Sequence, residues 1–362
     1  MKDYSPNSLY DESIPIEKIL YSNFIKYASL PEMISKEFAG SKATTVNIFI
    51  DLNHFFMKAY QFLKVESYYA PTAIAINYGA HFRSYFRTRL GVYANIILVY
   101  SPNMSENNSR FYPQYNSSYI NRMRSNERVM SMIVQNINVL RVLCPYLPNV
   151  YLREGSVEPG VIIKDLIDTD FNNGFPNIII SNSDYMLQVP GFLAAPTVVF
   201  RKDSKLKNGA FSYNAYSALN AYLYCSKHLD LNYPIPVDVP KRFVTLLMVL
   251  SGLPGRKVKS VFDYKHSIDI LKYIPVTIYG NVEDMYDNVQ KYMLSHTGRT
   301  TMSYKEFSDR FYALDVNFQW KLYRELPEYM DRSYLTRMND PNEVKAINNK
   351  YFQKSPIDLE RL

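Results

Sequence analysis

The sequence predicts an α/β protein with a mostly parallel central sheet flanked by helices. Short β-branched and aromatic runs alternate with amphipathic stretches of helical spacing along the first part of the chain, as is typical of βαβ units. In the stretch from Val46 to Leu63, the apolar strand Val46–Ile50 is followed at once by Asp51 and then by an amphipathic helix. From about Val237 onward the pattern is helical throughout, which predicts a separate helical region.

Composition and charge restrict the classes of protein that are possible. The chain has 362 residues and is 47% hydrophobic, enough for one large or two modest domains. Its formal net charge of +7 permits a polyanionic partner. Cys144 and Cys225 are the only cysteines and form no CxxC pair, which argues against a thiolate zinc site and indicates a reducing compartment. The sequence shows neither a signal peptide nor a membrane span, so we expect a cytoplasmic protein, in the host cytoplasm if it is viral.

The periodicity predicts a definite order of elements. The expected strands are Val46–Ile50, Asn95–Tyr100, Asn149–Leu152, Asn177–Ile180 and Pro196–Phe200. The expected helices are Phe55–Leu63, Ala73–Leu90, Arg128–Leu143, Glu158–Asp168, Pro240–Ser251 and a helix that begins with Arg256–Phe262. These elements divide the chain into an extension (1–45), an α/β domain (46–236) and a helical region with a C-terminal tail (237–362).

Asp51 is the first candidate for a functional residue. An acid at the carboxyl end of an apolar strand lies where open α/β sheets place their ligands. The structural alternative is that Asp51 or Asn53 caps the helix that follows. The local sequence leaves both interpretations open.

Basic residues gather in three parts of the chain. Arg83 and Arg87 are four residues apart, so they share a helical face that is either simply solvated or tracks phosphates. The polar segment 101–126 mixes arginines with aromatic residues, a combination that suits single-stranded nucleic acid. A third group follows the turn after Ser251, where cations at the start of the expected helix suit a phosphate. The arginines and lysines of the last two groups are Arg110, Arg122, Arg124, Arg256, Lys257 and Lys259.

Seven segments, taken in order over roughly residues 46–275, carry a family resemblance. They are FIDLNHFFMKAYQFL, PTAIAINYGAHFRSYFRTRL, ANIILVYSP, RFYPQY, VYLREGSVEPGVIIKDLI, SNSDYMLQV and LLMVLSGLPGRKVKSVF. Together they resemble the flap endonuclease and 5′–3′ exonuclease family, which includes phage RNase H-type enzymes and polymerase-associated nucleases. The resemblance implies a PIN-like nuclease fold, with Lys58 in place of the family's arginine, and a helix-turn-helix that grips duplex DNA.

The resemblance also implies a metal site, which is incomplete in this sequence. The family hydrolyses phosphodiesters with two divalent ions, which need a cluster of carboxylates. Asp51 and Glu158 match family acids, whereas the other acidic positions fall on Tyr100–Ser101, Pro159, Gly160, Ser183 and Tyr185. Asp184 lies between two of those positions and is the third candidate ligand. The expected cofactor is therefore either none or weakly bound Mg²⁺ or Mn²⁺.

Three hypotheses about function remain. The first is a degenerate family member from a bacteriophage or other virus that binds branched or duplex DNA through phosphate contacts and cuts it little or not at all. Lys58, Arg83 and Arg87 would lie near the old site, and Arg256, Lys257 and Lys259 on the duplex. The second is an active metal-dependent 5′–3′ exonuclease or flap endonuclease with a reduced site. The third is a structural subunit of a viral replication or transcription complex.

Overall fold

The computed structural model describes most of the chain. The described residues are 26–27, 44–56, 68–102, 106–115, 125–171, 174–193, 195–205, 211–216, 242–253, 256–275, 279–298, 302–325, 341–353 and 356–362.

A single sheet of seven strands forms the centre, in the order β1-β7-β6-β5-β2-β3-β4. The strands are β1 (Lys26–Tyr27), β2 (Thr45–Asp51), β3 (Tyr93–Tyr100), β4 (Val150–Glu154), β5 (Asn177–Ile180), β6 (Thr197–Lys205) and β7 (Phe211–Tyr216). The five strands from β6 to β4 are parallel to one another, and β7 and β1 continue the sheet in antiparallel pairing. The predicted α/β class with a mostly parallel sheet is confirmed.

The two faces of the sheet build two separate cores, because alternate strand residues point to opposite sides. Ile48 and Ile50 of β2 belong to one buried cluster, together with the helices before and after β3. Phe49 lies between them in the sequence and belongs to the other cluster, which also contains the helical region. All three side chains are fully buried. This explains why the central strands are apolar on both faces rather than alternating.

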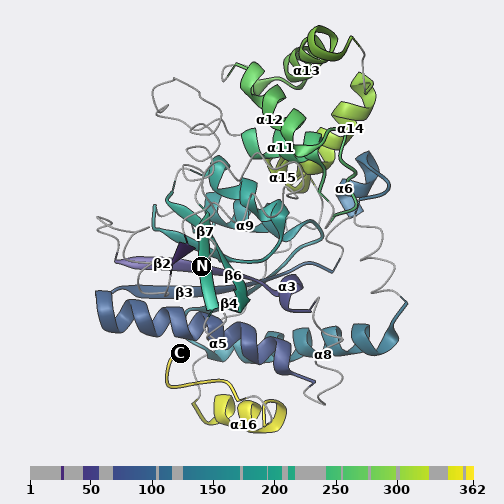
Figure 1. The fold of residues 1–362 in the computed structure, drawn as a ribbon. Coiled ribbons are helices and arrows are strands. Elements are labelled where there is room, and N and C mark those ends of the chain that lie inside the picture. The colour runs from purple at the N-terminus through teal and green to yellow at the C-terminus, as the bar shows by residue number, and fades with distance from the viewer. Residues whose placement is uncertain are drawn as a thin grey trace.

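Helices cover both faces (Figure 1). On one face lie α5 (Ala70–Tyr85) and α8 (Glu127–Leu143), with α16 (Pro341–Tyr351) packed beyond them. On the other face lies α9 (Pro159–Asp168), and the helical region stands above it. The shorter helices of these layers are α3 (Leu52–Phe56), η2 (Phe86–Leu90), α6 (Glu106–Phe111), η3 (Cys144–Tyr146) and η4 (Asp184–Phe192).

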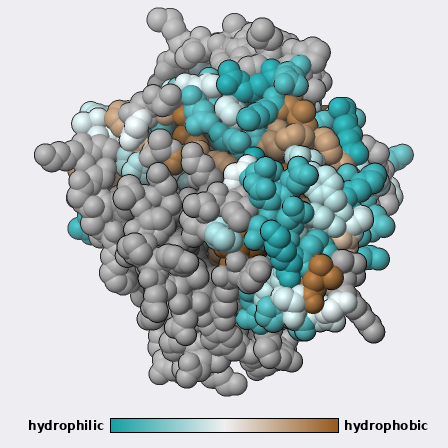
Figure 2. Space-filling view, turned by 90° about the horizontal axis from the view of Figure 1, so that it is seen from above, coloured by the Kyte–Doolittle hydropathy of each residue, from teal (hydrophilic) through white to brown (hydrophobic). Residues whose placement is uncertain are grey.

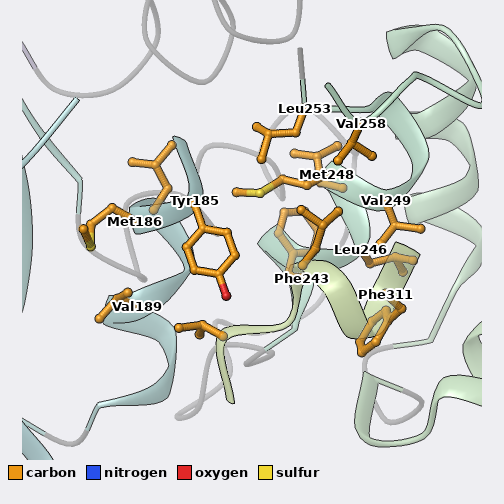
Figure 3. Packing of buried hydrophobic residues seen from close by; sticks show 14 of the residues in the cluster. Tyr185, Met186, Val189, Phe243, Leu246, Met248, Val249, Leu253, Val258 and Phe311 are labelled. Atoms are coloured by element: carbon orange, nitrogen blue, oxygen red, sulfur yellow. The ribbon is translucent and has the colours of Figure 1, made fainter. Parts of the chain in front are cut away.

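The helical region consists of α11 (Phe243–Ser251), α12 (Tyr264–Tyr273), α13 (Val282–Thr297), α14 (Tyr304–Leu314) and α15 (Val316–Arg324). Figure 3 shows how it is attached to the sheet layer: Tyr185, Met186 and Val189 of η4 lie beside the apolar face of α11. Phe243 and Met248 of α11 are buried in the same cluster. Seen from above in Figure 2, the coloured surface of this part is largely hydrophilic, with scattered apolar residues. Its apolar side chains therefore mainly serve internal packing.

The connection between α11 and α12 differs from the prediction. Residues 256–262 are not helical, and α12 begins only at Tyr264, with the Asp263 side chain accepting a hydrogen bond from the His266 N–H. Leu253 and Val258 instead form an antiparallel bridge, and Lys257 has a φ of 61°. A left-handed residue cannot continue an α-helix. The expected helix start at Arg256, with its free backbone N–H groups, is therefore wrong.

Two strands were not predicted. Residues 211–216 form β7, which pairs with β6. Lys26–Tyr27 lies in the predicted extension and forms β1 at the edge of the sheet. Among the described helices, none combines the length and apolar character needed to cross a membrane.

Candidate functional site

The candidate site lies where β2 ends and α9 begins. Asp51 is the last residue of β2, and Glu158 directly precedes the first helical residue of α9. Their exposed fractions are 2% and 1%, so both carboxylates are inside the protein. Buried carboxylates need partners, because removing a charge from water is costly. The partners of these two acids therefore show what the site can bind.

Asp51 is held by the backbone and by a serine. Its Oδ1 accepts a hydrogen bond from the His54 N–H at 3.3 Å, and its Oδ2 accepts one from the Ser181 hydroxyl at 2.7 Å. Burial raises the pKa of Asp51, while the Ser181 hydrogen bond and the nearby Arg256 oppose that rise. The first contact is the helix-capping role that the sequence left open.

Asn53 joins the ends of two neighbouring strands. Its amide nitrogen donates to the Ser101 carbonyl at 2.7 Å, and its side-chain oxygen accepts from the Ser101 N–H at 2.8 Å. Ser101 directly follows β3, one of the positions where the family resemblance implied an acid. We call the carboxyl ends of the parallel strands the rim of the sheet. At this point of the rim, the neutral Asn53 amide and the Ser101 backbone satisfy each other's hydrogen-bonding groups.

Glu158 is occupied by an arginine from the helical region. The Arg256 Nη2 donates to the Glu158 Oε2 at 3.1 Å and to the Ser183 hydroxyl oxygen at 2.9 Å. The Tyr115 hydroxyl donates to the Glu158 Oε1 at 3.0 Å. Burial raises the pKa of Glu158, Arg256 and Tyr115 lower it, and Asp51 raises it further. Burial alone would lower the pKa of Arg256, but Glu158, Tyr115 and Asp51 raise it above its ordinary value, so the guanidinium is charged.

The turn after α11 directs Arg256 inward and its neighbours outward. The Leu253 N–H donates to the Val258 carbonyl at 2.9 Å, and the Arg256 N–H donates to the Leu253 carbonyl at 2.8 Å. This tight loop leaves Arg256 8% exposed, whereas Lys257 and Lys259 are exposed. The Arg310 guanidinium donates a hydrogen bond to the Lys259 carbonyl. The loop therefore presents one cation to the sheet rim and two to solvent.

Solved structures with the same architecture include two of the bacteriophage T5 D15 protein. One was crystallised with metal ions and superposes with a TM-score of 0.52 at 11% identity; the alignment covers 86% of this chain and 99% of that one. The other is a flap endonuclease variant, a pseudo-enzyme in a product complex with DNA and metal ions, with a TM-score of 0.51, 12% identity and the same coverage. This chain has the flap endonuclease and 5′–3′ exonuclease fold. No protein-family model matches the sequence, and no curated protein matches it either.

Within the flap-nuclease fold, Asp184 does not join the two acids at the rim. Its Oδ1 pairs with the Arg201 Nη1 at 2.9 Å, and the Arg201 Nη2 donates to the Asn182 carbonyl at 2.5 Å. Asp184 begins η4, and this ion pair directs it toward β6. The prediction that Asp184 joins Asp51 and Glu158 as a ligand is not supported by this arrangement.

Three of the basic candidates lie in different places from those expected. Arg256 is buried against Glu158 rather than on the surface that a duplex could reach. Arg83 and Arg87 are not near the site, because α5 runs back along the sheet. The Arg83 Nη1 donates to the Pro148 carbonyl, just before β4 begins, so Arg83 lies at the amino ends of the strands, opposite the candidate site. Arg110 on α6 is exposed, like Lys257 and Lys259. Lys58, Arg122 and Arg124 lie outside the described residues.

The donor set at the rim does not fit a pair of divalent ions. No group of three or more His, Cys, Asp or Glu side chains in the described part of the chain could hold a metal. Mg²⁺ requires oxygen ligands in octahedral geometry. Here the Arg256 guanidinium lies beside both carboxylates and competes with any metal ion for their oxygens. The charged groups of the candidate site are therefore a network of two carboxylates, Asp51 and Glu158, and one arginine, Arg256.

Sequence reasoning missed three residues that contact this network. Tyr115 contacts Glu158, Ser181 contacts Asp51 and Ser183 contacts Arg256, but none of the three carries a charge of its own. A usable signal existed for the serines, since both follow β5 at the edge where Asp51 ends β2. Tyr115 lies in a predicted irregular segment, and only the folded structure brings its hydroxyl to Glu158.

Proposed function

We propose that this protein binds branched or duplex DNA on a flap-nuclease fold without cutting it. The proposal depends on one observation, which is the Arg256 guanidinium seated on Glu158 beside Asp51. Metal-dependent phosphodiester hydrolysis needs cations held at such carboxylates to activate water and stabilise the leaving oxygen. A guanidinium neutralises charge but cannot lower the pKa of a bound water as a metal does.

The arginine is well suited to remain in this position. A buried ion pair is costly to break, because removal of one partner leaves an uncompensated charge inside the protein. A divalent ion would have to expel a cation that is hydrogen-bonded to Glu158 and to Ser183. Displacement of Arg256 by Mg²⁺ is therefore expected to be unfavourable.

The similar T5 structure supports this interpretation by analogy. That protein is a variant with lysine in place of an aspartate, and it is a pseudo-enzyme in a product complex with DNA and metal ions. In that protein a cationic side chain and retained DNA binding go together. We infer the same combination here, with Arg256 as the natural cation, and the phage origin of that structure is compatible with a viral source for this chain.

DNA would contact the exposed side of the same loop. Lys257 and Lys259 project from the turn between α11 and α12, and Arg110 projects from α6. Such contacts to phosphates position a duplex without reading its sequence. Binding should therefore be independent of sequence and should weaken steeply as salt is added.

A flap-DNA assay read for both gel shift and cutting tests the proposal. We expect a shift without cleavage, with or without Mg²⁺ or Mn²⁺, and a weaker shift for the K257A/K259A variant. K291A/K345A is the matched control, since it removes two exposed lysines on α13 and α16. Absence of any shift would overturn the proposal.

The same assay can also reveal an active nuclease. Asp51 and Glu158 remain at the rim, so a metal-dependent enzyme with a reduced site is the alternative. It predicts cleavage with Mn²⁺ that the D51N variant abolishes. Cleavage that persists in D51N would have to come from another site or from a contaminant.

A further inference from the structure

At the end of the sheet opposite the candidate site, where the parallel strands β2 and β3 begin, lies an arginine cluster that the proposed function does not use. The cluster consists of Arg83, Arg87 and Arg89, from the last turn of α5 and from η2. Tyr93 begins β3 beside Thr45, at the amino end of the sheet. The strand rise of about 3.3 Å per residue separates Tyr93 from Val99, the β3 partner of Asp51, by roughly 20 Å.

Among the residues that the structure describes, no carboxylate forms an ion pair with this cluster. Within the described residues, Arg87 and Arg89 are exposed and make no ion pair, and Arg83 donates only to the Pro148 carbonyl. Burial lowers the pKa of Arg83, and the neighbouring charge of Arg87 lowers it further. The charges of Arg83 and Arg87 repel each other, so an anion that binds beside both is attracted by each of them.

Apolar and aromatic surface accompanies these cations. Tyr93 is 71% exposed, the highest value among the large hydrophobic side chains of the described residues, and Leu90 is 47% exposed. Gly91, with a φ of 66°, ends η2 and turns the chain into β3. The five-residue π-helical turn of η2 is itself rare, and such turns often occur at functional sites.

We propose that this end of the sheet, defined by Arg83, Arg87, Arg89 and Tyr93, is a second nucleic-acid surface that binds single-stranded segments. Arginines follow the phosphates, and an exposed tyrosine ring can stack on a base that is not already paired. A duplex offers no such base, because its rings are stacked within the helix. The surface therefore complements the lysines of the α11–α12 turn, which face a different part of the molecule.

Binding of a fluorescent oligo-dT, measured by anisotropy, tests this proposal. The R87E/R89E variant should bind at least tenfold more weakly, and the slope of log K against log salt should become shallower by about 1.4, as expected for the loss of two phosphate contacts. The Y93A variant should bind several-fold more weakly with an unchanged salt slope. K291E/K345E is the control, because it alters net charge equally and lies elsewhere on the surface.

The outcomes separate this inference from the proposed function. Oligo-dT affinity of R87E/R89E equal to that of K291E/K345E would overturn the inference, whatever happens to the duplex. An unaltered oligo-dT affinity of Y93A would also overturn the inference, because the arginines would then bind any polyanion without base stacking on Tyr93. Binding of a short duplex that depends on Lys257 and Lys259 and not on Arg87 would leave the proposed function intact.

Discussion

The Arg256 Nη2 donates a hydrogen bond to the Glu158 carboxylate at 3.1 Å, and both side chains are buried. This pair joins the helical region to the sheet layer at the start of α9, beside the end of β2. Its consequences for stability can be measured independently of any activity.

Replacement of Arg256 by methionine should destabilise the protein at neutral pH. The variant keeps most of the side-chain volume but leaves Glu158 and Asp51 without their cation, at an expected cost of about 3–5 kcal/mol. Urea unfolding measures this cost. The double variant R256M/E158M removes both charges and should lose much less. A double variant as unstable as R256M would show that the ion pair is not the cause.

The penalty in R256M should also depend on pH. Burial and Asp51 already raise the pKa of Glu158 above its ordinary 4.5, and removal of Arg256 takes away the largest opposing effect. The native state then binds a proton more tightly than the unfolded state does, so its stability falls as pH rises above 4.5. The deficit relative to wild type should thus be larger at pH 7 than at pH 4.

Replacement of Asp51 by asparagine should not destabilise the protein at pH 7. The pKa of Asp51 is raised from 3.8, so the protonated form is favoured in the native state and ionisation costs stability as pH rises from 3.8 toward the native pKa. Asparagine avoids this cost and keeps an oxygen for the His54 N–H. Urea unfolding at pH 4 and pH 7 should therefore give a flatter pH profile for D51N. A large loss at pH 7 would mean that the ionised carboxylate is needed.

A row of polar side chains, three of them buried, crosses the sheet in register. The Asn95 side chain donates to Asn47 at 2.9 Å, Asn47 donates to Asn177 at 3.0 Å, and Asn177 donates to the Thr197 hydroxyl at 3.2 Å. These residues are direct partners on β3, β2, β5 and β6. The row therefore ties four parallel strands together through their side chains.

Removal of the central member of this row should be costly. N47A leaves the Asn95 amide and the Asn177 oxygen without partners inside the protein, and each unsatisfied group costs about 1–3 kcal/mol. We expect a loss of at least about 2 kcal/mol in urea unfolding. N138A, on the exposed side of α8, is the control and should change stability by less than about 0.5 kcal/mol. Equal effects of the two variants would contradict the role of the row.

The contrast between this row and the apolar strands shows what sequence patterns can reveal. Strands such as Val46–Ile50 were predictable because their β-branched and aromatic residues are a local signal. Asparagine is depleted in strands, so Asn47 and Asn177 weaken the strand prediction when their hydrogen-bond partners are not known. Residues 211–214 alternate aromatic and polar side chains, which is also a local strand signal.

Arg256 could not be assigned for a different reason. Its local sequence resembles a helix start, and helical geometry would have placed it on the surface with Lys257 and Lys259. The decisive partners, Glu158 and Ser183, lie far away in the sequence. The left-handed backbone of Lys257 that turns Arg256 inward is unusual for lysine and therefore not predictable from composition.

Gly252 allows the turn that carries Arg256, and its replacement by alanine should disturb the site. Its φ is 80°, and a Cβ atom there would lie 2.5 Å from the Ser260 backbone nitrogen. The backbone on both sides would have to move, at an expected cost of more than about 1 kcal/mol. G280A is the matched control, since a Cβ atom at Gly280 meets nothing within 4 Å. Urea unfolding of both variants, with duplex binding as a second readout, measures the effect. If G252A matched G280A in both measurements, the close approach at Gly252 would not be what holds Arg256 against Glu158.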